Sequence, residues 1–457
     1  MKLGLHLRPV LSRRCFRSYV PAGAGWKLIC LEGLGLNSSS RSLCYGQGQV
    51  YDSWERYIEG GRSGISDVTV DKHDGRLSLH WADGHLGSFS AKLLRDHCPE
   101  GRHPTTMQRQ LDTSSIEDGL LVDRTEVQAD IIRVHWKDGL QHDGLKDHVP
   151  VSSFPVPWLR EHCTSTTARA LRSQYEAHGG ATKPIFWGAD IFTGSDAPVV
   201  EYNDVMREAS SSSENPMTKL IQLLKRFGLA VVKGTPPTME GTEAFAKKFG
   251  FVRHTLYGGM WATSAEGDEE GYNDTAYSNV ALASHTDCTY FLDPPGLQIF
   301  CCVCAAATGG ESTYVDGLAV AERLSKENPE AFDYFCHTTL PYECFDNGCH
   351  YRAEGPVFLV GRQGHIVQVR HNDSDRAPLD LLSDEELDRF YCHHQALTRI
   401  IRDPTMVARI LLQPGDMVVC DNQRTLHGRE GFQGRRRMVG CYVGRDELES
   451  MGRVCGV

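Results

Sequence analysis

Short segments rich in β-forming residues follow one another through the carboxyl-terminal part of the chain. They occupy residues 297–303, 312–315, 357–360, 366–369, 417–420 and 438–442, with glycine or aspartate turns between them. Such segments predict antiparallel strands, and 361–364 predicts a hairpin turn between two of them. Many short antiparallel strands with a few inserted helices indicate a double-stranded β-helix, or jelly roll. The expected fold class is therefore mainly β with inserted helices.

Helices are expected at three places. An amphipathic stretch at 220–227 predicts the first, and 318–335 predicts the second. The third begins at Ser383, whose hydroxyl forms a capping box with Glu386 three residues later. It ends before Pro404, because proline cannot continue a helix.

The amino-terminal part contains an internal repeat. The pattern His-Trp-x-Asp-Gly ends a predicted strand twice, and each copy leads on to Leu-Arg-acid-His-Cys, at 94–98 and 159–163. The repeat predicts a small β-rich domain with pseudo-symmetry at 51–170. A polar linker at 171–185 would then join it to the jelly-roll domain at 186–457.

The first 31 residues contain no aspartate or glutamate and carry lysine and arginine among apolar and small residues. This composition predicts a mitochondrial presequence and spacer at 1–45, and hence a location in the matrix. A disordered basic tail is the alternative.

Bulk composition narrows the choice of partners. The net charge of -11 repels phosphate backbones, so nucleic acid is not an expected partner. No apolar run is long enough for a transmembrane helix, so no membrane association is expected.

The 16 cysteines form no disulfide-like framework, and we expect reduced, buried thiols.

Two histidines and one aspartate form a candidate metal site. His285 and Asp287 are two residues apart, and such residues point to the same face of a strand. His427 follows the predicted strand 417–420 and the loop 421–426. Two imidazoles and a carboxylate make the facial triad of non-haem Fe(II) oxygenases. A histidine beside an acid by chance is the alternative, since the chain has 20 histidines.

Three arginines at 435–437 follow His427. Arg436 is expected to face inward from the next strand, where its guanidinium can bind a dicarboxylate with two parallel hydrogen bonds. Arg435 and Arg437 are expected on a solvated face.

These motifs resemble a known family, the branch of 2-oxoglutarate oxygenases that contains trimethyllysine dioxygenase and γ-butyrobetaine dioxygenase. The resemblance lies in 273–277, 285–291 and 421–430, although Gln423 stands where the family usually has tryptophan. It implies Fe(II) on the triad, 2-oxoglutarate on Arg436 and Ser312, ascorbate as a further cofactor and O2 as a reactant. It is also compatible with a homodimer.

The resemblance also implies a substrate with a trimethylammonium group. Tyr257, Trp261, Tyr277 and Tyr442 match the family's aromatic cage. A quaternary ammonium cannot donate a hydrogen bond, so ring faces must recognise it. The alternative is that these rings simply fill a core. Asn372 is a candidate contact for the far end of the substrate, and its alternative is a turn residue.

The implied reaction is 3-hydroxylation of N6-trimethyllysine in carnitine biosynthesis, coupled to decarboxylation of 2-oxoglutarate to succinate and CO2. Hydroxylation of γ-butyrobetaine to carnitine is the first alternative. A catalytically inactive module that binds methylated lysine is the second, although such a module needs no iron.

The amino-terminal domain contains a candidate zinc site. Family members often hold zinc there with closely spaced cysteines, whereas this chain offers Cys98, Glu100 and His103, with His148 or His142 later. A Cys-Glu-His-His set can bind zinc but is unusual in a structural site. A metal-free domain is the alternative.

Overall fold

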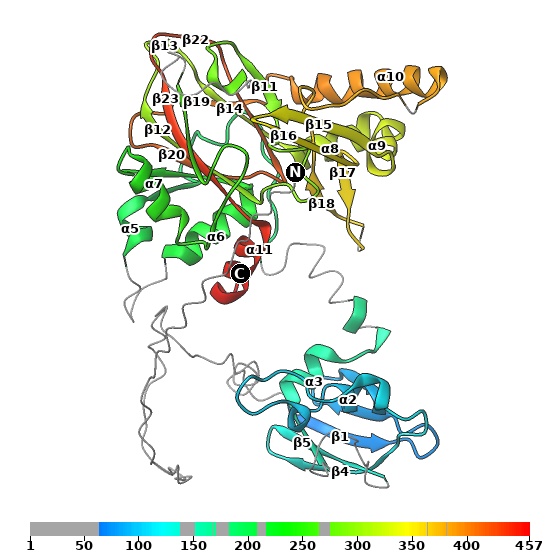
Figure 1. Ribbon diagram of the computed structural model, residues 1–457. Coiled ribbons are helices and arrows are strands. Elements are labelled where there is room, and N and C mark those ends of the chain that lie inside the picture. The colour runs from blue at the N-terminus through cyan, green and yellow to red at the C-terminus, as the bar shows by residue number, and fades with distance from the viewer. Residues whose placement is uncertain are drawn as a thin grey trace, which may run out of the picture. The chain divides into compact units, whose positions relative to one another are not determined.

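The computed structural model describes residues 64–137, 151–166, 168–170, 182–207, 216–264, 275–362, 364–380 and 382–457. They form an amino-terminal domain and a larger carboxyl-terminal domain (Figure 1). The expected presequence at 1–45 and most of the expected linker at 171–185 lie outside these residues. None of the helices that the structure describes is long and apolar enough to cross a membrane.

The repeat predicted in the amino-terminal domain is confirmed. In each copy, three antiparallel strands precede a short helix. The first copy contains β1 (Ile65–Val70), β2 (Leu77–Trp81), β3 (Leu86–Phe89) and α2 (Ala91–Asp96). The second contains β4 (Val122–Gln128), β5 (Ile131–Trp136), β6 (Val151–Pro155) and α3 (Val156–His162). The second Asp-Gly turn, at 138–139, lies outside the described residues.

The two copies exchange an arginine–tryptophan contact. The guanidinium of Arg95, at the end of α2, lies 6.0 Å from the ring centroid of Trp136 on β5. The guanidinium of Arg160 on α3 lies 5.3 Å from the ring centroid of Trp81 on β2. Each helix therefore packs its arginine on the strand of the other copy. The buried apolar residues of both copies form one core cluster.

The carboxyl-terminal domain contains two main sheets. The larger has the order β10-β23-β12-β20-β8-β7, with β9 also paired to β23, and the smaller has the order β11-β21-β14-β19. The strands of the larger sheet are β7 (Val199–Glu201), β8 (Leu229–Lys233), β9 (Val252–Arg253), β10 (Met260–Ser264), β12 (Leu297–Cys304), β20 (Met417–Asp421) and β23 (Arg437–Val443). Those of the smaller are β11 (Leu282–His285), β14 (Ser312–Asp316), β19 (Ala408–Ile410) and β21 (Thr425–Arg429). This arrangement confirms a mainly β, jelly-roll domain.

Alternation along the strands explains how the sheets pack. Val231 and Val418, which are register partners, join a core with Tyr314 and Ala408 of the smaller sheet. The intervening residues of the larger sheet face the opposite way and pack against helices. These helices are α6 (Pro216–Phe227), α7 (Met239–Ala246) and α11 (Arg445–Cys455). Both faces of the larger sheet are therefore buried.

The helix predicted at 318–335 is wrong as a single element. It is two helices, α8 (Gly317–Glu327) and α9 (Pro329–His337), because Asn328 caps the second through its side chain and Pro329 stands at its first turn. The capping box of α10 (Asp384–Ile401) is confirmed. The hairpin of β17 (Phe358–Val360) and β18 (Ile366–Val369) is confirmed as well. A second hairpin, β15 (Leu340–Asp346) and β16 (Cys349–Gly355), was not predicted.

Candidate metal and substrate site

Neighbouring strands bring the two histidines of the candidate triad together. His285 ends β11, His427 lies on β21, and the two residues are register partners. Their ring centroids are 4.7 Å apart. His427 is therefore inside a strand, and the predicted loop 421–426 is wrong because β20 extends to Asp421 and β21 begins at Thr425.

The prediction that His285 and Asp287 lie on one strand is wrong, because β11 ends at His285 and Asp287 lies beyond it. Its backbone is held by Asn422 instead. The Asp287 N–H donates to Asn422 Oδ1 at 2.7 Å, and Asn422 Nδ2 donates to the Asp287 carbonyl at 3.1 Å. Asp287 Oδ1 lies 3.3 Å from Nε2 of each histidine. Ligand atoms of the three residues lie within 4.8 Å of one another.

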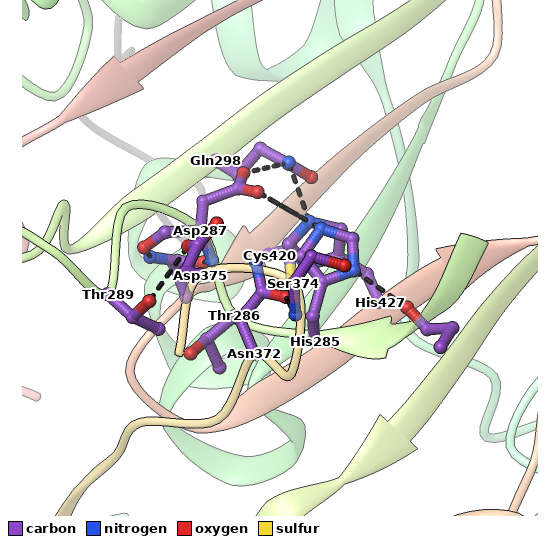
Figure 2. A network of polar contacts seen from close by, with 12 residues as sticks. His285, Thr286, Asp287, Thr289, Gln298, Asn372, Ser374, Asp375, Cys420 and His427 are labelled. Carbon is purple, nitrogen blue, oxygen red and sulfur yellow. Dashed lines mark hydrogen bonds and ion pairs between the residues drawn. The ribbon is translucent and has the colours of Figure 1, made fainter. Parts of the chain in front are cut away.

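The second carboxylate oxygen of Asp287 is held by two donors. Tyr442 donates its hydroxyl to Oδ2 at 3.0 Å. Gln298 Nε2 donates to the same carboxylate oxygen, as Figure 2 shows. Gln298 Nε2 also lies 2.8 Å from His427 Nε2. Neither Gln298 nor Asn422 was predicted from the sequence. A glutamine within the apolar strand β12 is the signal that could have found the first.

Electrostatics favour an ionised carboxylate at this site. Burial opposes ionisation of Asp287, but the two imidazoles hold its pKa well below the usual value. Burial likewise lowers the pKa of His285, but the hydrogen bond and charge of Asp287 outweigh it and raise the pKa to about 9. A carboxylate beside two imidazoles is a donor set that suits a divalent transition metal.

Arg436 is a buried cation that faces the same cavity. Its side chain is 6% exposed and lies 5.8 Å over the ring of Phe432. No acid among the described residues forms an ion pair with it. Burial lowers its pKa from an ordinary value of 12.5, yet arginine remains charged in proteins. An unpaired buried charge of this kind requires an anion. Arg435 is exposed and Arg437 half-buried.

One cavity of about 780 Å³ collects the predicted residues of this domain. Those residues are Tyr257, Trp261, Tyr277, His285, Asp287, Ser312, Asn372, His427, Arg436 and Tyr442. The rings of Trp261 and Tyr442 lie 5.4 Å apart between centroids. They belong to paired strands, because Trp261 is the register partner of Gly440, two residues before Tyr442.

Two further aromatic residues come from irregular segments. Tyr257 lies between β9 and β10, and its hydroxyl is 3.3 Å from that of Tyr290, which also lines the cavity. Tyr277 ends the short 3-10 helix Thr275–Tyr277. Asn372 lines the cavity and also behaves as a turn residue, since its Oδ1 accepts from the Ser374 N–H at 3.0 Å.

The candidate zinc residues are only partly described. Cys98 is buried and accepts a hydrogen bond from Ser152 at 2.8 Å. His103 Nδ1 accepts from the N–H groups of Thr105 and Thr106. His148 and His142 lie outside the described residues. Within the described part of the chain, only His285, Asp287 and His427 form a group that could hold a metal.

Comparisons with known proteins agree with this geometry. Residues 195–442 match the taurine catabolism dioxygenase TauD, TfdA family, and residues 68–145 match the gamma-butyrobetaine hydroxylase-like amino-terminal family. The chain is 30% identical to the mitochondrial trimethyllysine dioxygenase of Gallus gallus, over 84% of this chain and 87% of that protein. It is 29% identical to the protein of the same name in Rattus norvegicus, over 86% and 88%.

It is 28% identical to the gamma-butyrobetaine dioxygenase of a Pseudomonas species, over 82% of this chain and 92% of that protein. These matches span both described domains. The chain belongs to the family of Fe(II)- and 2-oxoglutarate-dependent oxygenases that contains trimethyllysine dioxygenase and γ-butyrobetaine dioxygenase.

Proposed function

We propose that this protein hydroxylates N6-trimethyllysine at C3, coupled to oxidative decarboxylation of 2-oxoglutarate to succinate and CO2. The observation that carries the proposal is the shared cavity. A His-Asp-His cluster, a buried guanidinium that no described acid pairs with and an aromatic wall all line it. The relatives named trimethyllysine dioxygenase support this choice of substrate.

The residues fit Fe(II) and 2-oxoglutarate. Asp287 Oδ1 and the two imidazole Nε2 atoms would hold the metal and leave positions for the cosubstrate and O2. Arg436, with the Ser312 hydroxyl nearby on the wall, would bind the far carboxylate of 2-oxoglutarate. With iron and 2-oxoglutarate bound, O2 would be the oxidant: one oxygen atom would replace the C–H bond with C–OH, and the other would enter succinate as 2-oxoglutarate loses CO2. Asn422, Gln298 and Tyr442 would keep Asp287 in place throughout.

The aromatic residues position the substrate. Trp261, Tyr442, Tyr257 and Tyr277 would surround the trimethylammonium group, each ring face contributing roughly 0.5–2 kcal/mol. The distance from this cage to the metal fixes which carbon lies over the metal. The aromatic wall also excludes water from the reacting atoms.

The same assignment suggests where the protein is located, which further cofactors it uses and how it assembles. We place the protein in the mitochondrial matrix, since several relatives are named mitochondrial. Ascorbate would serve as a reductant. Zinc in the amino-terminal domain, with Cys98, His103 and His148, and a homodimeric assembly remain predictions. The acidic net charge argues against nucleic acid as a partner.

The test is succinate formation measured by NMR. Turnover should require Fe(II), 2-oxoglutarate, O2 and N6-trimethyllysine together, and Asp287→Ala should abolish it. γ-Butyrobetaine, assayed in parallel, is the second candidate substrate because a relative of that name matches most of the chain. Succinate formed with γ-butyrobetaine alone would replace the proposal. Absence of turnover with either substrate, despite tight binding of trimethyllysine, would favour an inactive methyl-lysine-binding module.

A further inference from the structure

Tyr314 is a buried residue of the cavity wall that was not predicted from the sequence. It lies on β14 directly opposite His427 on β21, and register partners on neighbouring strands point to the same face of a sheet. Ser312, two residues earlier on β14, points to that face as well. Both side chains line the cavity and are buried. Tyr314 therefore faces the interior of the jelly roll, beside residues proposed to bind iron and 2-oxoglutarate.

The hydroxyl end of Tyr314 lies near Arg436 and Ser312. Ser312 forms a hydrogen bond with the phenol, and the charge of Arg436 acts on it. The ionisable neighbours that act on Arg436 are Tyr314 and Cys302. Burial raises the pKa of the Cys302 thiol to about 12 and raises that of the Tyr314 phenol as well, so both groups are neutral near neutral pH. These neighbours therefore leave the positive charge of the guanidinium uncompensated.

A carboxylate accepts hydrogen bonds at about four positions. The guanidinium of Arg436 can fill two of them with parallel N–H donors, and the Ser312 hydroxyl can fill a third. Tyr314 can fill the fourth, since a phenol both donates and accepts hydrogen bonds. A buried carboxylate is stable only when its charge is paired and its acceptor positions are satisfied. Three donors in one buried part of the cavity therefore match the far carboxylate of 2-oxoglutarate.

We propose that Tyr314 donates its hydroxyl to the far carboxylate of 2-oxoglutarate and completes the binding site that Arg436 and Ser312 begin. The inference rests on the proposed function, which uses this cosubstrate. The ring of Tyr314 packs edge-to-face against Phe192, with centroids 5.9 Å apart. This contact fixes the position of the ring and, with it, the hydroxyl. A donor that is in place before the ligand arrives adds affinity without a cost for ordering it.

Tyr314→Phe tests the proposal, because it removes the hydroxyl and keeps the ring. The probes are 2-oxoglutarate and 2-oxovalerate, which has a methyl group in place of the far carboxylate. Calorimetry with Mn(II)-loaded protein measures the Kd of each without turnover. Loss of a hydrogen bond to a charged group corresponds to about a ten- to hundredfold change, and we expect the Kd of 2-oxoglutarate to rise by that factor. The Kd of 2-oxovalerate should change less than about threefold, which also shows that the variant is folded.

Tyr342→Phe is the matched control. Tyr342 is also buried, and its hydroxyl donates to the Arg370 carbonyl at 3.2 Å. Neither of these two residues is among those that line the cavity, so the control should keep its affinity for 2-oxoglutarate. An unchanged Kd of 2-oxoglutarate in Tyr314→Phe, or an equal loss of affinity for both probes, would overturn the inference. So would an equal weakening of 2-oxoglutarate binding in Tyr342→Phe.

The wild-type protein separates this inference from the proposed function. If it binds 2-oxoglutarate no more tightly than 2-oxovalerate, it has no site for the far carboxylate, and both assignments are refuted. If it prefers 2-oxoglutarate and Tyr314→Phe keeps that preference in full, only the role of Tyr314 is refuted, and the hydroxylase assignment stands.

Discussion

At the scale of single residues, Arg436 combines burial with the absence of an acidic partner among the described residues. Replacing an unpaired buried charge with an apolar side chain of similar volume is neutral or stabilising. Arg436→Met should therefore leave the free energy of unfolding of the ligand-free protein unchanged or raise it. Wild-type protein should gain about 2.7 kcal/mol when 2-oxoglutarate reaches a hundred times its Kd, and the variant should gain nothing. Urea titrations with and without 2-oxoglutarate, on Mn(II)-loaded protein, measure both effects.

Tyr442 serves two functions with two parts of its side chain. Its ring lies in the aromatic wall, and its hydroxyl donates to Asp287. Tyr442→Phe removes only the hydroxyl. Loss of a group that orients a metal ligand typically weakens metal binding by about 10- to 100-fold, so we expect Mn(II) affinity to fall in that range. Trimethyllysine affinity at saturating metal should change little, whereas Tyr442→Leu should weaken it. Equal metal affinity in Tyr442→Phe and wild type would contradict this division.

His371 gives the fold a pH dependence. Burial lowers its pKa from 6.5 to about 4. Between those values the unfolded chain binds a proton that the folded chain does not, so stability is lost as the pH falls. The loss should reach about 3 kcal/mol between pH 6.5 and pH 4. Urea unfolding of metal-free protein across this range measures it. His371→Gln should make the free energy of unfolding less dependent on pH in this range. An unchanged slope would mean that other groups cause the pH dependence.

Much of the site was accessible from the sequence, because chemistry constrains residue type strongly there. The triad and Arg436 stand out by spacing and charge. Gln298 and Asn422 do not, since their roles depend on which strands become neighbours. Gln298 reaches Asp287 from β12, and Asn422 reaches it from the turn after β20. Such contacts between distant segments have no local signature.

At the scale of elements, β21 is fixed in place by an ion pair at its start. The guanidinium of Arg424 donates to both oxygens of Asp316, at 3.0 and 2.9 Å, where the two side chains are 6% and 0% exposed. Asp316 also caps α8. The pair therefore joins the strand that carries His427 to the helix that follows β14.

Arg424→Met should cost about 3–5 kcal/mol, because it leaves a buried carboxylate unpaired. The measurement is the free energy of urea unfolding. Arg445→Met is the control, since the partly exposed pair of Arg445 and Asp421 should contribute less. Restoring stability with Asp316→Leu in the Arg424→Met background would confirm that the unpaired charge causes the loss. Equal losses in the two single variants would contradict this explanation.

Strand positions were predicted well, and interruptions were predicted poorly. Strands such as β18 and β20 consist of apolar β-formers between turns, so local pattern is enough. The break between α8 and α9 was missed, although Asn328-Pro329 marks a helix start, because the apolar period continues across it. The strand β21 was missed because its sequence, TLHGR, has polar residues where a cavity requires them.

At the scale of the whole molecule, the two domains have separate hydrophobic cores. One cluster contains only residues between Leu77 and Ala168, and the other three contain only residues from Trp187 onward. Separate cores predict separate unfolding events. Scanning calorimetry should show two transitions, of which only one rises in temperature when Mn(II) and 2-oxoglutarate are added. A single transition that shifts as a unit would mean that the two domains unfold cooperatively.

The exchanged arginine–tryptophan contacts limit how the amino-terminal domain can be divided. A peptide with only the first copy keeps Trp81 but loses Arg160, and it keeps Arg95 but loses Trp136. Two such peptides could replace these contacts only by pairing with each other, so that Arg95 of each packs on Trp81 of the other. Because the two copies are covalently linked, contacts that would otherwise require two molecules form within one chain. Truncation inside this domain should therefore give fragments that self-associate, and not a smaller stable domain.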